Sequence, residues 1–119
     1  MSELQVEHAG DVVIARPTED IDTANARAVQ RTLAACLDRD ADHLILDLSA
    51  VRYLDSAGLD MLLRLSELLR HRRSELLVVI PGSSPLTRVA EIVDLPSIVP
   101  VHPTLADALA AYGQRRASS

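Results

Sequence analysis

The sequence of 119 residues contains no phenylalanine, tryptophan or lysine, and it has only two tyrosines. Recognition of single-stranded nucleic acid is not expected, because it depends on aromatic side chains on which bases stack. The formal net charge of −5 also argues against direct binding to nucleic acid or to anionic membranes. Without lysine, neither Schiff-base chemistry nor a lysine-based phosphate cradle is available.

Disulfide partners and long apolar runs are missing as well. Cys36 is the single cysteine, so no intrachain disulfide can form and nothing indicates an oxidising compartment. The first residues are polar and acidic, where a signal peptide would have an apolar run. No stretch approaches the roughly 20 apolar residues of a membrane span. We therefore expect a cytoplasmic protein without membrane insertion.

Signatures of catalysis and of metal binding are also lacking. The histidines are scattered along the chain and show no paired ligand spacing. No Gly-x-Ser-x-Gly elbow, P-loop or dinucleotide-binding fingerprint occurs. Asp47 could resemble an aspartyl phosphoacceptor at a strand end, but that chemistry needs a lysine, and ordering of the following turn is the better interpretation. We expect no enzymatic activity, no metal site and no cofactor.

Leucine, valine, isoleucine and alanine must build the core, and the length suits one domain. Alternating or continuous apolar patterns predict strands at residues 4–8, 12–15, 44–48, 76–80 and 98–101. Helical spacing predicts four helices, around residues 26–37, 59–70, 86–93 and 104–111. This order predicts an α/β fold with a mixed, mostly parallel sheet of about five strands. We assign residues 1–113 to the domain and expect Gly113 to end the last helix, leaving 114–119 as a disordered tail.

The most informative segment covers residues 44–59, LILDLSAVRYLDSAGL. It reads as a buried strand, a short turn, and a serine at the start of a leucine-rich helix. From these residues alone two interpretations remain open. Ser56 could simply cap the helix, with Asp60 favoured near the positive end of the helix dipole. Alternatively, its hydroxyl could be modified, because Ala57 and Gly58 leave it uncrowded.

Residues Ile45-Leu46-Asp47-Leu48 and Asp55-Ser56-Ala57-Gly58-Leu59 resemble the phosphoacceptor region of the STAS-domain anti-sigma-factor antagonists. A second match is Thr18-Glu19-Asp20-Ile21-Asp22, in a loop that precedes the first helix, and the resemblance covers about residues 4–112. It implies a STAS-type fold with Ser56 as a phosphorylation site. It also implies that the unphosphorylated form captures an anti-sigma factor and so frees a sigma factor. A serine kinase anti-sigma factor and a protein phosphatase are the implied partners.

The same resemblance implies a surface that contacts the anti-sigma factor, formed by the two matching loops and the helix after Ser56. Asp22 or Thr23 could instead only cap the first helix. A phosphate on Ser56 would add about −1.5 to −2 charge beside Asp55 and Asp60, and free helix N–H groups could accommodate it locally. The expected contact residues are Asp20, Asp22, Thr23, Asp55, Ala57, Gly58, Leu59 and Met61.

Two departures from the family pattern bear on this interpretation. Glu19 replaces the usual glycine of the first loop, and Asp60 stands where the family often has a second glycine. Either could tune partner choice or mark a paralogue that has lost kinase recognition. The alternative function is that of a STAS scaffold subunit in a stress-signalling or lipid-transport complex, without sigma-factor control.

Overall fold

The computed structural model describes residues 4–37 and 43–118. The sequence DRDAD at residues 38–42 predicts a charged connector between the first helix and the central strand, and this segment lies outside the described residues. Strands and helices follow one another in the predicted order, with a short 3-10 helix, η1, added before the last strand. The elements are β1 (Leu4–Ala9), β2 (Val12–Pro17), α1 (Ala26–Cys36), β3 (His43–Asp47), α2 (Ser56–His71), β4 (Leu76–Val79), α3 (Leu86–Ile92), η1 (Leu95–Ser97), β5 (Val101–His102) and α4 (Leu105–Ser118).

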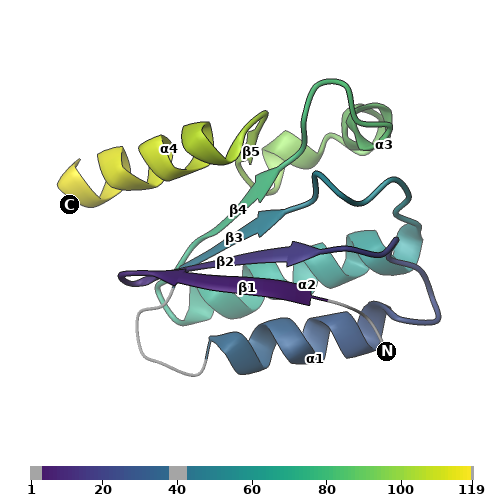
Figure 1. Cartoon of the computed structure of the whole chain (residues 1–119), viewed down its shortest axis with the longest axis horizontal. Coiled ribbons are helices and arrows are strands. Elements are labelled where there is room, and N and C mark those ends of the chain that lie inside the picture. Colours follow the sequence, from purple (N-terminus) through teal and green to yellow (C-terminus); the bar gives the residue numbers. More distant parts are fainter. Residues whose placement is uncertain (1–3, 38–42, 119) are drawn as a thin grey trace.

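The strands form one sheet in the order β1-β2-β3-β4-β5, as Figure 1 shows. β1 pairs with β2 antiparallel, through a turn at Gly10, and every other neighbouring pair is parallel. Ile14 lies opposite Ile45, which in turn lies opposite Leu77. The predicted mixed, mostly parallel sheet is therefore confirmed.

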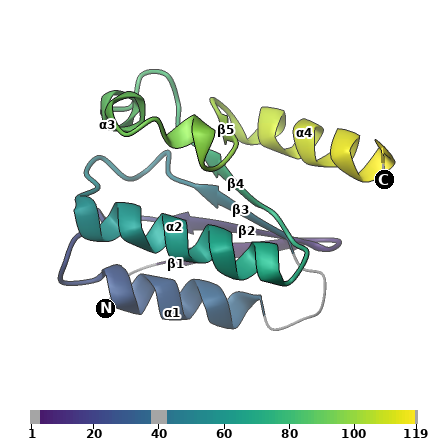
Figure 2. The ribbon, with the colours of Figure 1, turned by 180° about the vertical axis from the view of Figure 1, so that it is seen from behind.

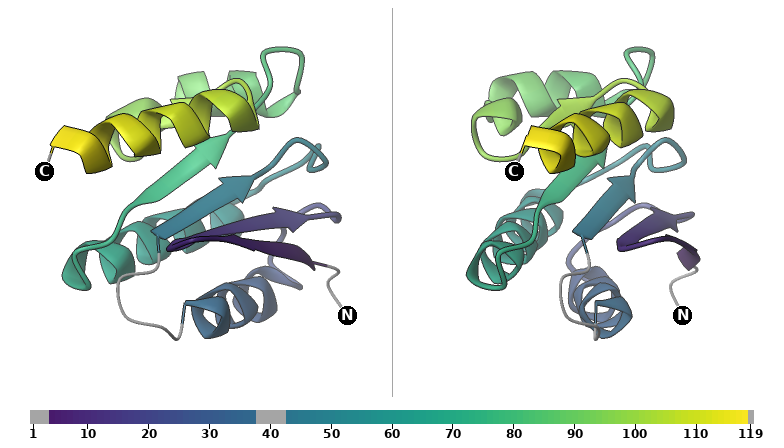
Figure 3. Two further views of the ribbon diagram at one scale, coloured as in Figure 1. Left: turned by 60° about the vertical axis from the view of Figure 1, so that its left-hand side comes forward. Right: turned by 90° about the vertical axis from the view of Figure 1, so that its left-hand side faces the viewer.

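Helices cover both faces of the sheet. α1 and α2 lie side by side on one face, and α4 lies on the other (Figures 2 and 3). The alternation of β3 explains this layering, since Leu44, Leu46 and Leu48 belong to the larger core under α1 and α2. Ile45 points the opposite way, into the smaller core that includes Ala108 and Tyr112 of α4.

One ion pair joins two parallel strands near their carboxyl ends. Asp47, only 2% exposed, accepts a hydrogen bond from Nε of Arg16 at 3.0 Å and lies 2.9 Å from its Nη2. Its other oxygen accepts the N–H of Ser49 at 3.0 Å. The predicted ordering of the turn after β3 by Asp47 is therefore confirmed. The carboxylate needs these partners because an unpaired buried charge is costly.

Several element ends differ from the prediction, and those of β5 and α4 have a clear physical reason. β5 covers Val101–His102 instead of residues 98–101, because the chain enters it from Pro100, which has no N–H to donate. The predicted end of the last helix at Gly113 is wrong, since α4 continues to Ser118. A glycine ends a helix when it adopts a left-handed conformation, and in the described residues Gly10 is the only glycine with positive φ.

Candidate partner-binding site

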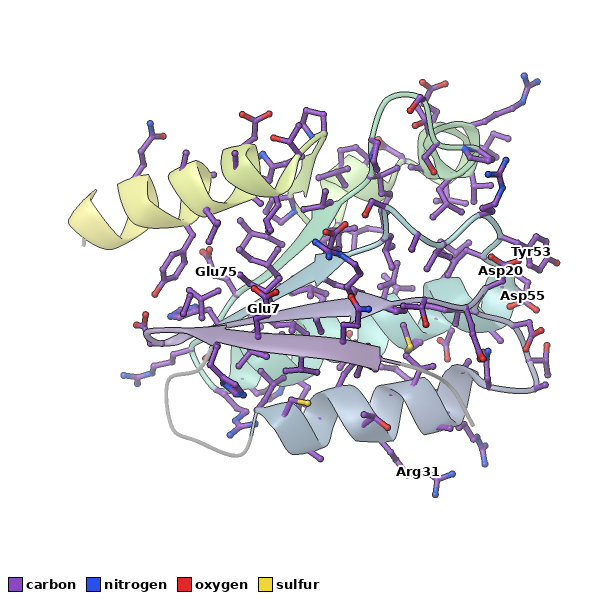
Figure 4. The ribbon with its side chains drawn as sticks, viewed as in Figure 1. Glu7, Asp20, Arg31, Tyr53, Asp55 and Glu75 are labelled. Carbon is purple, nitrogen blue, oxygen red and sulfur yellow. The ribbon has the colours of Figure 1, made fainter. Side chains whose placement is uncertain are left out.

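Two loops meet at the carboxyl ends of β2 and β3, and together they form the surface around Ser56. Ile21 of the first loop forms an isolated parallel bridge with Leu54 of the second. The Ile21 N–H donates to the Tyr53 carbonyl at 3.2 Å, and the Asp55 N–H donates to the Ile21 carbonyl at 3.3 Å. Figure 4 shows Asp20, Tyr53 and Asp55 close together at this end of the molecule. The fold thus brings together the two sequence segments that carry the family resemblance.

Asp20 holds the second loop in place. Its Oδ1 accepts the N–H groups of Arg52 at 2.9 Å and of Tyr53 at 3.1 Å. The Asp20 carbonyl also accepts a hydrogen bond of 2.7 Å from the side-chain amide of Asn25. Asp20 is exposed, and its Oδ2 forms no hydrogen bond with a described residue. Asp20 therefore orders the second loop, and its expected contact with a partner stays a prediction.

The turn before α1 is organised by Asp22 and Asn25. Asp22 Oδ1 accepts the N–H groups of Ala24 at 2.9 Å and Asn25 at 3.2 Å. In return, Asn25 Oδ1 accepts the Asp22 N–H at 2.9 Å. Asp22 therefore caps the turn that leads into the helix, although the residue that directly precedes α1 is Asn25. Thr23, the alternative capping residue, has a different partner.

Asp55 is the N-cap residue of α2, which corrects the interpretation of Ser56 as the cap. Its Oδ1 accepts the N–H groups of Ala57 at 3.0 Å and Gly58 at 3.1 Å. Its Oδ2 accepts the N–H and the hydroxyl of Thr23, at 3.1 and 3.2 Å. The N–H of Gly58, with further hydrogen bonds from Thr23 and Ala57, lowers the pKa of Asp55 below its ordinary value against a smaller opposing effect of desolvation. A single carboxylate thus joins the first loop to the start of α2.

Ser56 is the first residue of α2, and its side chain is exposed. Because Asp55 already caps the helix, the Ser56 hydroxyl forms no hydrogen bond with any residue that the structure describes. The predicted accommodation of a phosphate by helix N–H groups stays a prediction. The Ala57 and Gly58 N–H groups are already bonded to Asp55, so a phosphate would have to compete with that carboxylate.

The remaining expected contact residues differ in accessibility. Ala57 and Leu59 are half-buried and remain available to a partner. Met61, in contrast, is 1% exposed and belongs to the core, although it also lines the cavity between α1 and α2, so its expected partner contact stays a prediction. Gly58 is also buried, because α2 packs closely on the second loop: a Cβ at this position would lie 2.9 Å from Leu54 Cγ and 3.2 Å from Ile21 Cγ2. Gly58 therefore allows close packing of α2 on the second loop, and the expectation that it leaves the Ser56 hydroxyl uncrowded stays a prediction.

Three arginines near this surface were not identified from the sequence. Arg27 and Arg31 of α1 and Arg64 of α2 line a cavity of about 490 Å³ between the two helices. In the sequence, Arg27 and Arg31 belong to no motif. Their spacing of four residues, which places both on one helical face, was the available signal.

Neither a metal centre nor a membrane segment is found in the part of the chain that the structure describes. No group of three or more histidine, cysteine, aspartate or glutamate side chains there could hold a metal ion. Among the described helices, none combines the length and the apolar character needed to cross a membrane.

Comparisons with known proteins agree in one family. Residues 3–108 match the model of the STAS domain. A relative from Bordetella bronchiseptica, BtrV, assigned as an anti-sigma factor antagonist, is 34% identical over 92 residues, which are 77% of this chain and 78% of that protein.

Solved structures give the same result. An anti-sigma factor antagonist from Mycobacterium paratuberculosis superposes with a TM-score of 0.81 at 31% identity, covering 93% of both chains. The antagonist SpoIIAA, in its unphosphorylated form, has a TM-score of 0.74 at 15% identity over 94% of this chain and 97% of its own, a likeness of fold alone.

Proposed function

The chain belongs to the STAS-domain family, among the anti-sigma factor antagonists, and on this premise we propose that it binds an anti-sigma factor while Ser56 is unmodified and loses this binding when Ser56 is phosphorylated. The observation that carries the proposal is the exposed Ser56 hydroxyl, which has no partner among the described residues and lies on a surface that two bonded loops hold in place. Binding to such a partner is consistent with action in the bacterial cytoplasm.

The proposed modification is an ordinary phosphoryl transfer. A serine kinase, which is the anti-sigma factor itself, moves the γ-phosphoryl group of ATP to Ser56 Oγ. The hydroxyl proton goes to a base of the kinase, and ADP leaves. A protein phosphatase later hydrolyses the ester, which restores the hydroxyl and releases inorganic phosphate. The antagonist is the substrate in both steps, and catalysis belongs to its partners.

Electrostatics explains why the phosphate would end binding. The modification adds about −1.5 to −2 charge at pH 7. Asp55 precedes Ser56 in the chain, and Asp60 lies one helical turn later, so the phosphate would meet two carboxylates. Since Asp55 already accepts the N–H groups of Ala57 and Gly58, a phosphate would have to compete for these two donors. Burying this charge against a partner would be costly, and the fold need not change.

The test compares three full-length variants with the wild-type protein. Lysate of the source bacterium is passed over each immobilised protein, mass spectrometry identifies the retained proteins, and the purified anti-sigma factor is then used to measure Kd. We expect Ser56→Ala to bind like wild type. Ser56→Glu should bind about a hundredfold more weakly, because an unpaired interfacial charge costs on the order of 3 kcal/mol. Ser83→Glu adds the same charge at an exposed serine before α3 and should leave Kd unchanged.

Two results would contradict the proposal. Equal binding by Ser56→Ala and Ser56→Glu would show that charge at this position does not control the interaction. Recovery of stress-complex or lipid-transport subunits, unaffected by Ser56→Glu, would favour the alternative function of a STAS scaffold subunit.

A further inference from the structure

The cavity between α1 and α2 is lined by arginines that come from both helices. Figure 2 shows the two helices side by side on one face of the sheet. The alanines Ala26 and Ala57 leave the space of about 490 Å³ open, and the side chains of Arg27, Arg31 and Arg64 surround it. Figure 4 shows Arg31 extending from α1 away from the sheet. This arrangement is named here the arginine recess.

The arginine recess carries uncompensated positive charge. Asp60 is the one acidic residue that lines it, and its Oδ2 lies 2.7 Å from Nε of Arg64. Arg27 and Arg31 form no ion pair or hydrogen bond with any described residue. Three guanidinium groups and one carboxylate therefore leave two positive charges, in a chain whose net charge is −5. Negatively charged groups are the ligands that such a site attracts.

The recess also continues the surface around Ser56. Thr23 and Ala57 line it, and both donate backbone N–H groups to Asp55, which directly precedes Ser56. A protein that covers Ser56 can therefore reach the recess without crossing another element. Because Ala26 and Ala57 are small, the recess has room for side chains of the partner to enter between the guanidinium groups.

We propose that the arginine recess binds an acidic segment of the protein that covers Ser56, with carboxylate side chains entering between Arg27, Arg31 and Arg64. Planar guanidinium groups bind carboxylates in two-point geometry, which adds direction to the charge attraction. Exposed ion pairs contribute little to affinity, but pairs that an interface shields from water contribute more. The same charges accelerate association with an acidic partner at low salt. The identity of the partner as an anti-sigma factor rests on the function proposed above, whereas the acidic chemistry rests on the recess itself.

A defined probe tests the chemistry independently of the anti-sigma factor. The full-length ¹⁵N-labelled protein is titrated at low salt with a synthetic helical peptide that carries glutamate at every fourth position, and with its glutamine counterpart. We expect the glutamate peptide, and not the glutamine peptide, to shift the Nε–Hε resonances of Arg27 and Arg31. Arg31→Glu should remove at least nine-tenths of the affinity. Arg88→Glu changes the net charge equally at an exposed position on α3 and should retain it.

No selective shift at millimolar glutamate peptide would overturn the proposal, as would equal losses in Arg31→Glu and Arg88→Glu. The purified anti-sigma factor then separates the two proposals. Weakening of its binding by Ser56→Glu but not by Arg31→Glu would overturn the recess as its contact and leave the proposed function intact. Absence of any anti-sigma factor partner, together with selective binding of the glutamate peptide, would overturn the function and support the recess as an acidic-peptide site.

Discussion

At the scale of single residues, Asp55 shows how one side chain serves both structure and site. Its two oxygens accept hydrogen bonds from the start of α2 and from Thr23, which is 32 residues away in sequence. Because Asp55 performs the capping, the neighbouring Ser56 hydroxyl is left available. The two residues of the Asp-Ser motif therefore have different functions. Asp55 orders the backbone, and Ser56 is exposed to solvent.

The hydrogen bonds of Asp55 predict that the stability of the fold depends on pH through the ionisation of this carboxyl group. A pKa lower in the folded than in the unfolded state means that the folded protein binds fewer protons at this group. Its stabilising contribution is therefore present above the unfolded pKa of about 3.9 and is lost as the pH falls through the lower, folded pKa. We expect Asp55→Ala to lower Tm by about 3–6 °C at pH 7, in the range of a lost helix cap in a domain of this size.

Thermal unfolding followed by circular dichroism from pH 7 down to pH 3 measures this difference. The gap in Tm between wild type and Asp55→Ala should narrow below about pH 4, where the unfolded-state carboxyl becomes protonated. Glu19→Ala removes an exposed carboxylate that has no hydrogen bond with a described residue, and it should change Tm little at any pH. A gap that stays constant across the pH range would show that ionised Asp55 is not the stabilising group.

At the scale of elements, the start of α2 is determined by how closely the helix approaches the two loops. Gly58 is placed where any Cβ would contact the buried side chains of Leu54 and Ile21. These two residues also form the backbone bridge between the loops. The helix can therefore lie against the bridge only if residue 58 has no side chain, and this contact positions Ser56 beside both loops.

Two glycines in helices provide a matched comparison. Gly58→Ala should lower the free energy of unfolding by about 1–3 kcal/mol, because the added methyl group overpacks the contact with Leu54. Gly113→Ala, in α4, introduces a Cβ with no atom within 4 Å. It should raise the free energy of unfolding by up to about 1 kcal/mol through helix propensity alone. Urea unfolding measures both values, and an equal gain in both variants would show that the approach of α2 does not require glycine.

At the scale of the whole molecule, α4 covers the second face of the sheet and joins the last part of the chain to the β1–β2 turn. The Tyr112 hydroxyl donates a hydrogen bond of 2.6 Å to Asp11 Oδ1 in the β1–β2 turn, 101 residues away in sequence. The Tyr112 ring also lies against the His43 ring, with centroids 5.0 Å apart. The core between α4 and the sheet is the smaller of the two, so the attachment of α4 is expected to open locally more easily than the layer of α1 and α2.

Removal of the Tyr112 hydroxyl tests this attachment. Tyr112→Phe should lower the free energy of unfolding by about 1 kcal/mol, the net contribution of a typical hydrogen bond. Amide hydrogen exchange should accelerate in α4 more than in α1 and α2. Tyr53→Phe, at a side chain that is 55% exposed, serves as the control and should change neither quantity. Equal acceleration in all helices would indicate global destabilisation instead of local release of α4.

Much of the fold followed from the sequence because its signals are local. The continuous apolar run Leu44-Ile45-Leu46 indicates a strand that is covered on both faces, whatever the neighbouring strands are. Local turn chemistry also precedes two of the helices, where the hydroxyl oxygens of Ser84 and Thr104 accept the N–H groups of Leu86 and Asp107. The end of α4 was missed, because a glycine permits a left-handed turn without requiring one.

The sequence by itself determined the order of the elements, the family, and the position of Ser56 at the start of a helix. Only the tertiary structure decided that Asp55 is the cap, that Met61 is buried, and that three arginines from two helices surround one recess. The physical reason is distance along the chain. Periodicity and turn chemistry act over a few residues, whereas the hydrogen bonds from Thr23 to Asp55 and from Arg52 to Asp20 each join residues 32 positions apart, which only the packing of the sheet and its helices brings together.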